Sequence, residues 1–287
     1  MNPGSPSSSP HSPSLQGVSH YENFPVATVL CPPHLRPAIA AIYWFARTAD
    51  DIADEGDALP QTRLDDLAAY RVDLMATAAG QAPSKRWAEV FGQLGPVIRQ
   101  FALPVDLLAD LLSAFEQDVV KQRYANQAEL FDYCRRSANP VGRLLLHLYG
   151  VKDAQSLIES DCICTALQLI NFWQDLGVDI ARGRIYLPAD SWAEHGVDEA
   201  QLLRLESNPA TIQLIAAHAR QACAMMLKGS PLVRKVPGRG GWELRLVVQG
   251  GLRILDKIEA LGFNTLQQRP TLGKWDVTVM LWRSLWM

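Results

Sequence analysis

The chain has 287 residues, and 48% of them are hydrophobic, which is enough apolar material for one large domain or two smaller ones. The 27 Lys and Arg residues nearly balance the 30 Asp and Glu residues, and the net charge of −3 excludes the basic signature of a nucleic-acid-binding protein. Five scattered cysteines indicate reduced thiols in a cytosol and argue against a disulfide framework.

Residues 1–17 are rich in serine and proline. They contain neither the apolar core nor the basic start of a signal peptide, so we expect a disordered tail in front of one domain over residues 18–287. The longest uncharged run near the middle of the chain, 162–174, is too short and too polar to span a membrane. These features predict a cytoplasmic protein.

From about residue 24 onward the apolar residues recur with helical periodicity, and no convincing strand or hairpin pattern occurs, so an all-α fold is predicted. Pro60 and Pro104 mark helix starts, and glycines mark several helix ends. Pro140 predicts either a loop between two short helices or a bend that faces a cavity. The predicted helices cover residues 33–55, 60–79, 84–101, 104–123, 127–149, 153–180, 209–228, 241–261 and 275–285.

Three aspartates stand at the end of the first predicted helix, soon after a stretch, 38–46, that carries no charge. Residues three and four apart share a helix face, so one polar stripe runs along an otherwise apolar helix. Its members are Tyr43, Arg47, Asp50 and Asp54. A buried carboxylate is costly unless a positive charge meets it. The alternative is a helix end whose acids are solvated.

A second stripe follows the helix predicted over residues 153–180, which is rich in Ile, Leu, Phe and Trp. Spacings of three, four and four place its members on one face, and two arginines come directly after them. The stripe and these arginines are Gln168, Asn171, Asp175, Asp179, Arg182 and Arg184.

Two such helices facing each other would form a cage of oxygen ligands. Mg²⁺ prefers oxygen ligands and usually shares them with substrate phosphates. The guanidinium groups of Arg47, Arg182 and Arg184 would then bind a diphosphate. Metal ions bridging to a diphosphate would compensate the buried acids. Asp118 is either an outer contact of this site or part of a surface ion pair.

The segments DDIAD, NFWQDLGVD and GRIYLP resemble the squalene/phytoene synthase family, the trans head-to-head isoprenoid synthases, over about residues 18–274. The phrases ENFPVAT, AIYWFARTADDIADEGDA, CRRSANPVGRLLLHLYG and GGLRILDKIEALGF are most similar to the bacterial hydroxysqualene synthases within that family. The resemblance implies an isoprenoid synthase fold, a single helical domain around a deep apolar cavity.

The resemblance also implies roles for the two stripes. Asp50 and Asp54 match the first metal-binding pair, and the second set, matched by Asn171, Asp175 and Asp179, completes a site for two or three Mg²⁺ ions. The positions matched to residues beside the diphosphate or lining the active site are Tyr43, Arg47 and Gln168.

Several residues depart from the commoner family pattern. Gln174 stands where many members have Arg, Val178 where many have Glu, and Phe263 at a usual Tyr position. The segment SANPVG replaces VAGTVG, and Arg135 replaces a frequent aromatic residue. These differences favour a substrate later in the pathway than two separate prenyl diphosphates.

The implied reaction is a Mg²⁺-dependent lyase reaction that converts presqualene diphosphate and water to hydroxysqualene and diphosphate in squalene and hopanoid biosynthesis. It needs no NADPH, and no dinucleotide-binding G-x-G-x-x-G segment is present. One alternative is a presqualene diphosphate, squalene or phytoene synthase that condenses two prenyl diphosphates, such as farnesyl diphosphate. The other is a non-catalytic scaffold, against which the intact acids argue.

The C-terminal segment carries an apolar stripe with Lys274 and Arg283 beside it. One interpretation is peripheral contact with the inner membrane, where tryptophan favours the headgroup region and a long hydrocarbon substrate would dissolve. The other, which we favour, is packing within the protein, because most apolar helical stripes are intramolecular. The stripe consists of Trp275, Val279, Trp282 and Trp286.

Enzymes that supply the substrate or take the product are further expected partners.

Overall fold

The computed structural model describes residues 31–287, and the predicted tail over residues 1–17 lies outside this range. The described chain is all-α, as the sequence predicts, with one isolated bridge between Arg123 and Ile185. None of its helices is long and apolar enough to cross a bilayer. In chain order the helices are α1 (Arg36–Asp54), α2 (Pro60–Ala78), α3 (Ala88–Phe101), α4 (Val105–Val120), α5 (Gln127–Ser137), α6 (Asn139–Leu148), α7 (Ala154–Gln174), α8 (Leu176–Ala181), α9 (Ala189–Glu194), α10 (Glu199–Leu203), α11 (Pro209–Gly229), the 3₁₀ helix η1 (Ser230–Arg234), α12 (Arg239–Ala260) and α13 (Lys274–Ser284).

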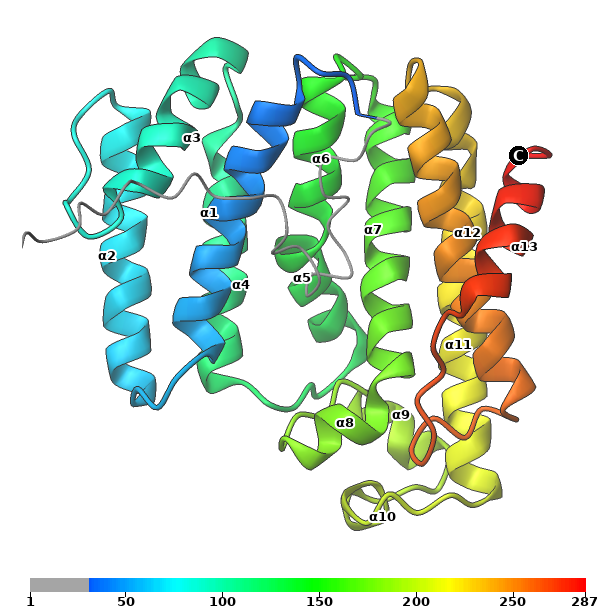
Figure 1. Ribbon diagram of the computed structural model, residues 1–287. Coiled ribbons are helices and arrows are strands. Elements are labelled where there is room, and N and C mark those ends of the chain that lie inside the picture. Colours follow the sequence, from blue (N-terminus) through cyan, green and yellow to red (C-terminus); the bar gives the residue numbers. More distant parts are fainter. Residues whose placement is uncertain (1–30) are drawn as a thin grey trace, which may run out of the picture.

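Two groups of helices stand side by side, with α6 and α7 between them (Figure 1). The helices α1 to α4 surround one hydrophobic core, and α7, α11 and α12 surround a second. Helix α6 belongs to both, since Val141 and Leu144 pack into the first core and Leu146 into the second. Helix α6 therefore forms the boundary between the two hydrophobic cores.

The helix predicted over residues 127–149 is divided at Ala138 into α5 and α6. Pro140 lies in the first turn of α6, where its missing N–H costs no hydrogen bond. No loop separates the two helices, and Val141 and Gly142 line a cavity. Of the two interpretations of Pro140, the bend that faces a cavity is confirmed.

The single helix predicted over residues 153–180 is wrong, because α7 ends at Gln174 and α8 begins at Leu176. The cause is a tertiary contact. The Gln174 side chain donates a hydrogen bond of 2.8 Å to the carbonyl oxygen of Pro270. A Cβ atom on Gly177 would lie 2.4 Å from the carbonyl oxygen of Leu266, so only glycine permits this approach. The segment 265–270 thus packs across the junction between the two helices.

Helix α13 lies where the sequence predicts it, but the favoured packing of its tryptophans into the protein is wrong. Trp275, Trp282 and Trp286 are exposed, while Asp276 is buried against α12. The Asp276 carboxylate lies 2.7 Å from the Nε of Arg253 and 2.8 Å from the Nζ of Lys257. These ion pairs, rather than the tryptophan stripe, determine which face of α13 packs inward.

His218 of α11 is buried, and it predicts a loss of stability in acid. Its Nε2 lies 2.8 Å from the hydroxyl of Ser191, and its ring lies against Trp173. Burial and the nearby charge of His195 lower the pKa of His218 to about 4. At pH values between the ordinary histidine pKa near 6.5 and this lowered pKa, His218 is protonated in the unfolded chain but neutral in the folded chain.

We expect His218 to reduce the free energy of unfolding by about 2 kcal/mol between pH 7 and pH 5. His218→Gln should remove this contribution, which urea unfolding of both proteins at the two pH values measures. The comparison with the variant is needed because carboxyl groups with a raised pKa, such as that of Asp118, act in the opposite sense. An equal change with pH in both proteins would contradict the prediction.

Candidate active site

The acids of the two predicted stripes lie at the same end of the molecule. The C-terminal end of α1 and the α7–α8 junction both lie at the lower end of Figure 1. Asp50 and Asp54 belong to the last turns of α1, and Asp175 and Asp179 belong to the junction and to α8. Arg184 connects the two groups, because it lies 2.5 Å from Asp54 and its charge also acts on Asp179.

In the described structure, arginine side chains form ion pairs with these acids. Arg47 lies 3.3 Å from Asp50 and 2.7 Å from Asp51, one turn further along α1. The Nε of Arg269 donates a hydrogen bond of 2.5 Å to Asp175, and its Nη2 donates a second of 3.1 Å. The pairing with Arg269 is fork-shaped, which is the geometry that guanidinium groups also adopt on phosphates.

The arginines do not fully compensate the buried negative charge. Burial raises the pKa of Asp50 to about 6, although Arg47 lowers it. Burial and the charge of Asp175 raise the pKa of Asp179 to about 7. Over residues 31–287, no group of three or more His, Cys, Asp or Glu side chains is close enough to hold a metal ion alone. A cation here would therefore take some of its ligands from a bound molecule.

The other predicted residues lie around these acids. Tyr43 is buried one turn before Arg47 on α1, and Gln168 and Asn171 are half-buried on the C-terminal half of α7. Arg182 is exposed at the end of α8, but its charge still lowers the pKa of Asp179. All ten predicted residues therefore lie on α1, on α7 and α8, at the junction between those two, or within three residues after α8.

Asp118 of α4 belongs to the same site and not to the surface. Its carboxylate accepts a hydrogen bond of 2.9 Å from the hydroxyl of Tyr133, and Arg184, Asp50 and Asp54 are its charged neighbours. Burial raises its pKa to about 7. Asp118 therefore lies beside the predicted acids, while its contact with a metal or a diphosphate stays a prediction. The sequence did not predict Tyr133, because a single tyrosine gives no pattern.

Aromatic rings gather beside this carboxylate. The rings of Phe172 and Tyr186 stack with their centroids 3.7 Å apart. Tyr133 lies 6.4 Å from Tyr186, and Tyr124 lies 5.8 Å from Tyr186 and 5.7 Å from Tyr133. Burial raises the pKa of Tyr133 and of Tyr186, so both keep their protons at neutral pH. The site therefore joins carboxylates to a wall of neutral aromatic rings.

Arg269 is the second residue that the sequence did not predict. It lies 94 residues from Asp175 in the chain, on the segment that crosses the α7–α8 junction. The hydrogen bond from Gln174 to Pro270 fixes the residue next to it. Gln174 therefore holds the segment that brings Arg269 to Asp175.

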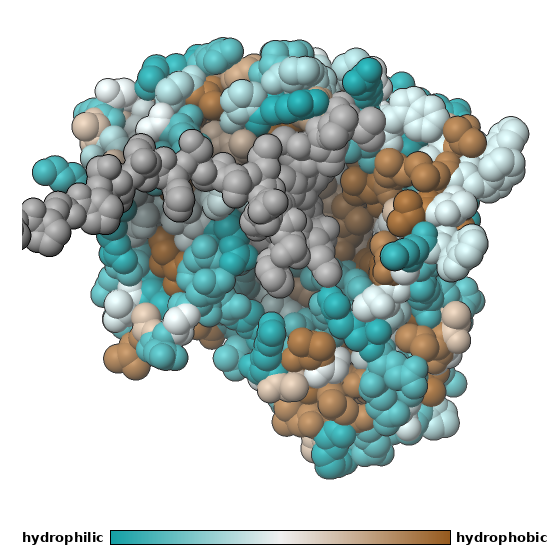
Figure 2. All heavy atoms as spheres, in the orientation of Figure 1, coloured by the Kyte–Doolittle hydropathy of each residue, from teal (hydrophilic) through white to brown (hydrophobic). Residues whose placement is uncertain are grey.

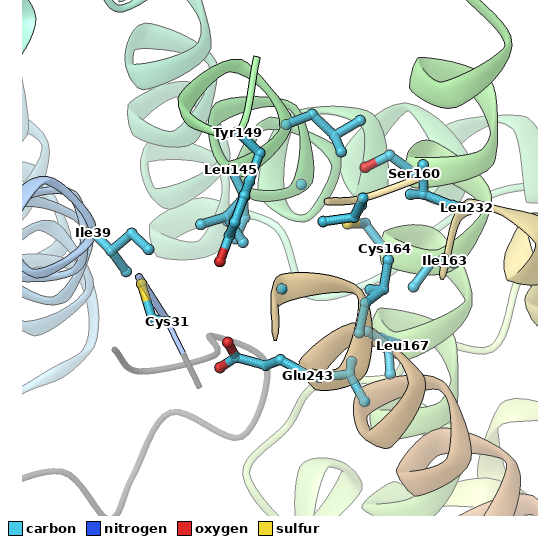
Figure 3. Close-up of a pocket in the computed structure, with 17 residues that line it drawn as sticks. Cys31, Ile39, Leu145, Tyr149, Ser160, Ile163, Cys164, Leu167, Leu232 and Glu243 are labelled. Carbon is cyan, nitrogen blue, oxygen red and sulfur yellow. The ribbon is translucent and has the colours of Figure 1, made fainter. Parts of the chain in front are cut away.

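A cavity lies among α1, α6, α7 and α12. The empty space within it, part of it open to solvent, is about 760 Å³. Ile39, Leu145 and Leu167 contribute to its apolar wall (Figure 3). Tyr149, Cys31 and Glu243 bring polar groups together at one end. The deep apolar cavity that the sequence predicts is confirmed.

The cavity lies at a suitable distance from the acids for a long hydrocarbon chain. Leu167 is eight residues before Asp175, or about 12 Å along the axis of α7. Ser160, which lines the cavity seven residues earlier, is about 22 Å from Asp175 along the same axis. The site therefore combines a charged end with an apolar extension of prenyl-chain length.

Comparison with known proteins agrees with this geometry. The family model for squalene/phytoene synthase matches residues 18–276. A hydroxysqualene synthase of Sinorhizobium fredii is 33% identical over 250 residues, 87% of this chain and 82% of that protein. A hydroxysqualene synthase of Zymomonas mobilis is 38% identical over 221 residues, 75% of this chain and 71% of that protein.

A solved structure agrees over most of its length as well. Squalene synthase HpnC from Alicyclobacillus acidocaldarius superposes with a TM-score of 0.79 and 36% identity, covering 85% of this chain and 90% of that one. The fold is therefore the isoprenoid synthase fold. The chain belongs to the squalene/phytoene synthase family.

Proposed function

We propose that the protein is a hydroxysqualene synthase, which converts presqualene diphosphate and water to hydroxysqualene and diphosphate. One observation carries this proposal: two sets of carboxylates lie at the C-terminal ends of α1 and α7, and both helices line an apolar cavity. The relatives that are 33% and 38% identical over most of their length are named for this activity, and they support the choice within the family.

We propose that the carboxylates hold two or three Mg²⁺ ions together with the diphosphate. The donor set fits, because it offers carboxylate and amide oxygens and because burial raises the pKa of Asp50 and of Asp179, a cost that a bound cation would offset. When bound, Mg²⁺ neutralises the diphosphate and polarises the leaving oxygen. The residues that would hold it are Asp50, Asp54, Asn171, Asp175 and Asp179.

The arginines would bind the diphosphate itself. Arg47, Arg184 and Arg269 are paired with acids in this structure. Once cations compensate those acids, the guanidinium groups can turn to the diphosphate oxygens. We place Arg182 at the rim of the same site because its side chain is exposed. Tyr43 and Gln168 would line the wall between the diphosphate and the cavity.

The chain then has to protect a carbocation. The carbon–oxygen bond breaks with its electron pair on the diphosphate, and the cavity keeps bulk water from the cation. The faces of aromatic rings attract cations, so we assign this role to Tyr186 and Phe172. The rearranged cation accepts the oxygen of one water molecule, whose proton passes to the released diphosphate. The balance consumes no hydride, so NADPH is not required.

The alternative is the condensation of two farnesyl diphosphates to presqualene diphosphate, squalene or phytoene. The purified chain should be incubated with Mg²⁺ and either presqualene diphosphate or farnesyl diphosphate, without NADPH. Release of diphosphate and an alcohol from presqualene diphosphate supports the proposal. Efficient release from farnesyl diphosphate alone would favour the alternative, and no release from either would favour a non-catalytic scaffold.

Gly177→Ala tests the role of the segment that brings Arg269 to the site. A methyl group at Gly177 would meet the Leu266 carbonyl oxygen at 2.4 Å, so the backbone of segment 265–270 must shift. We expect turnover to fall about tenfold and stability by about 1–3 kcal/mol. Steady-state kinetics and urea unfolding measure these effects.

Gly92→Ala is the matched control, because a Cβ atom at Gly92 of α3 meets nothing within 4 Å. Alanine there should leave turnover unchanged and favour the helix slightly. Unchanged turnover in Gly177→Ala would show that the position of segment 265–270 is not needed for the reaction.

The proposed reaction also bears on where in the cell the enzyme works. Its substrate and product are long hydrocarbons that dissolve poorly in water and collect in membranes. We therefore propose that the enzyme works peripherally at the cytoplasmic face of the inner membrane. The enzymes that supply presqualene diphosphate and take hydroxysqualene would be its partners on the same membrane.

A further inference from the structure

The outward face of α13 is apolar and open to solvent. Trp275, Trp282 and Trp286 are 83%, 63% and 74% exposed. Large apolar side chains this exposed on a single short helix mark an interaction surface rather than ordinary surface composition. We call this the α13 face, and it consists of Trp275, Val277, Leu281, Trp282, Leu285 and Trp286, each more than half exposed.

Polar contacts hold α13 in this orientation. An amphipathic helix on a globular protein usually turns its apolar stripe inward, and α13 does the reverse. Asp276 is clamped by Arg253 and Lys257, and at the other end Arg245 of α12 donates a hydrogen bond of 3.2 Å to the carbonyl oxygen of Ser284. The buried face is fixed by charge, so the tryptophans are directed outward by the fold itself.

The chemistry of the α13 face fits an anionic lipid surface. Tryptophan favours the headgroup region of bilayers, and basic residues at the edge of an apolar face attract anionic lipids. Lys274 and Arg283 are both exposed, Arg283 lies 2.7 Å from Asp256 of α12, and the sole acid over residues 272–287 is the buried Asp276. Trp242 of α12 is 43% exposed beneath the guanidinium of Arg245, which also binds the end of α13 through Ser284.

Helix α12 connects this face to the cavity. On one side it carries α13, with the side chain of Gln249 donating a hydrogen bond of 2.9 Å to the sulfur of Met287. On the other side Glu243, Leu244 and Val247 line the cavity. Figure 2 shows hydrophobic surface over α7 and α12, directly beside α13. A hydrocarbon chain that leaves the cavity past α12 would therefore emerge beside the α13 face.

We propose that the α13 face, together with Trp242, docks the protein onto an anionic phospholipid bilayer. Docking in this orientation sets the cavity beside the membrane, so that hydrocarbon substrate and product can exchange without crossing water. The need for this exchange rests on the proposed function. The docking itself rests on the exposed tryptophans and on the basic residues Lys274 and Arg283 beside them.

Flotation with vesicles tests the docking without any substrate. The full chain is mixed with phosphatidylcholine vesicles that contain or lack phosphatidylglycerol, and the bound fraction is measured at low and high salt. We expect stronger binding to the anionic vesicles that weakens with salt, and a blue shift of tryptophan fluorescence. The double variant Trp282→Ser/Trp286→Ser should bind about tenfold more weakly.

The matched control is Val72→Ser/Met75→Ser, which removes two exposed apolar side chains from α2 at the far side of the molecule. It should bind vesicles like the unaltered chain. Both variants should keep their activity on substrate dispersed in detergent, so a failure to dock remains distinct from a failure of the proposed reaction.

Three results would overturn the proposal. The first is a full chain that never floats, and the second is a tryptophan variant that floats as well as the control. The third is a dimer in sedimentation that the tryptophan variant dissolves while vesicles leave it intact, since the α13 face would then contact a second copy.

Discussion

Replacing Asp54 or Asp175 by Asn lowers turnover by about a hundredfold to a thousandfold while the fold survives. Asparagine keeps the shape of the side chain and removes one negative charge from the proposed Mg²⁺ site. The partners of these acids are arginines at the edge of the site, Arg184 and Arg269. Partly exposed ion pairs contribute little to stability, so we expect losses below about 1 kcal/mol.

Asp57→Asn is the control for this experiment. Asp57 is exposed in the turn that follows α1, close in sequence to the acids but outside the stripe. Its replacement should leave turnover unchanged. Initial rates with presqualene diphosphate at saturating Mg²⁺, together with circular dichroism, distinguish a lost charge from a lost fold. Near-normal rates in both Asp54→Asn and Asp175→Asn would contradict the metal site.

Filling the cavity should be nearly as damaging as removing a carboxylate. Leu145 and Leu167 line it from α6 and α7, and tryptophan at either position would occupy the space proposed for the hydrocarbon. We expect kcat/KM for presqualene diphosphate to fall about a hundredfold. Because the added ring enters empty space, the cost in stability should be at the lower end of about 1–3 kcal/mol.

Binding of inorganic diphosphate separates this effect from damage to the charged end. Diphosphate with Mg²⁺ should raise the melting temperature of Leu145→Trp and Leu167→Trp as much as that of the unaltered chain. Val72→Trp on the exposed face of α2 is the control for the added ring. Full activity in both cavity variants would mean that the substrate chain lies elsewhere.

The helices were predictable because their signals are local. Pro60 begins α2 and Pro209 begins α11, and in both the apolar spacing continues for about twenty residues. The short helices α9 and α10 were not predicted, since five or six residues are too few to show a period. The carboxylates at the end of α1 were predictable because residues three and four apart share a helix face, and those at the α7–α8 junction follow the same spacing.

The features that the sequence did not predict depend on contacts between distant segments. Nothing near Arg269 indicates that it meets Asp175, because a crossing segment that Gly177 permits brings the two together. The break after Gln174 has the same origin. The orientation of α13 was predicted wrongly because the tryptophan stripe suggests burial, whereas the ion pairs of Asp276 with α12 decide the outcome.

The central claim is that water captures a carbocation formed from presqualene diphosphate. The direct measurement is the product of that substrate in isotope-labelled water, with Mg²⁺ and without NADPH, followed by mass spectrometry. The account predicts hydroxysqualene that carries the heavy oxygen in its hydroxyl group, with diphosphate released in equal amount. Squalene as the product, or an alcohol whose oxygen comes from the substrate, would contradict it.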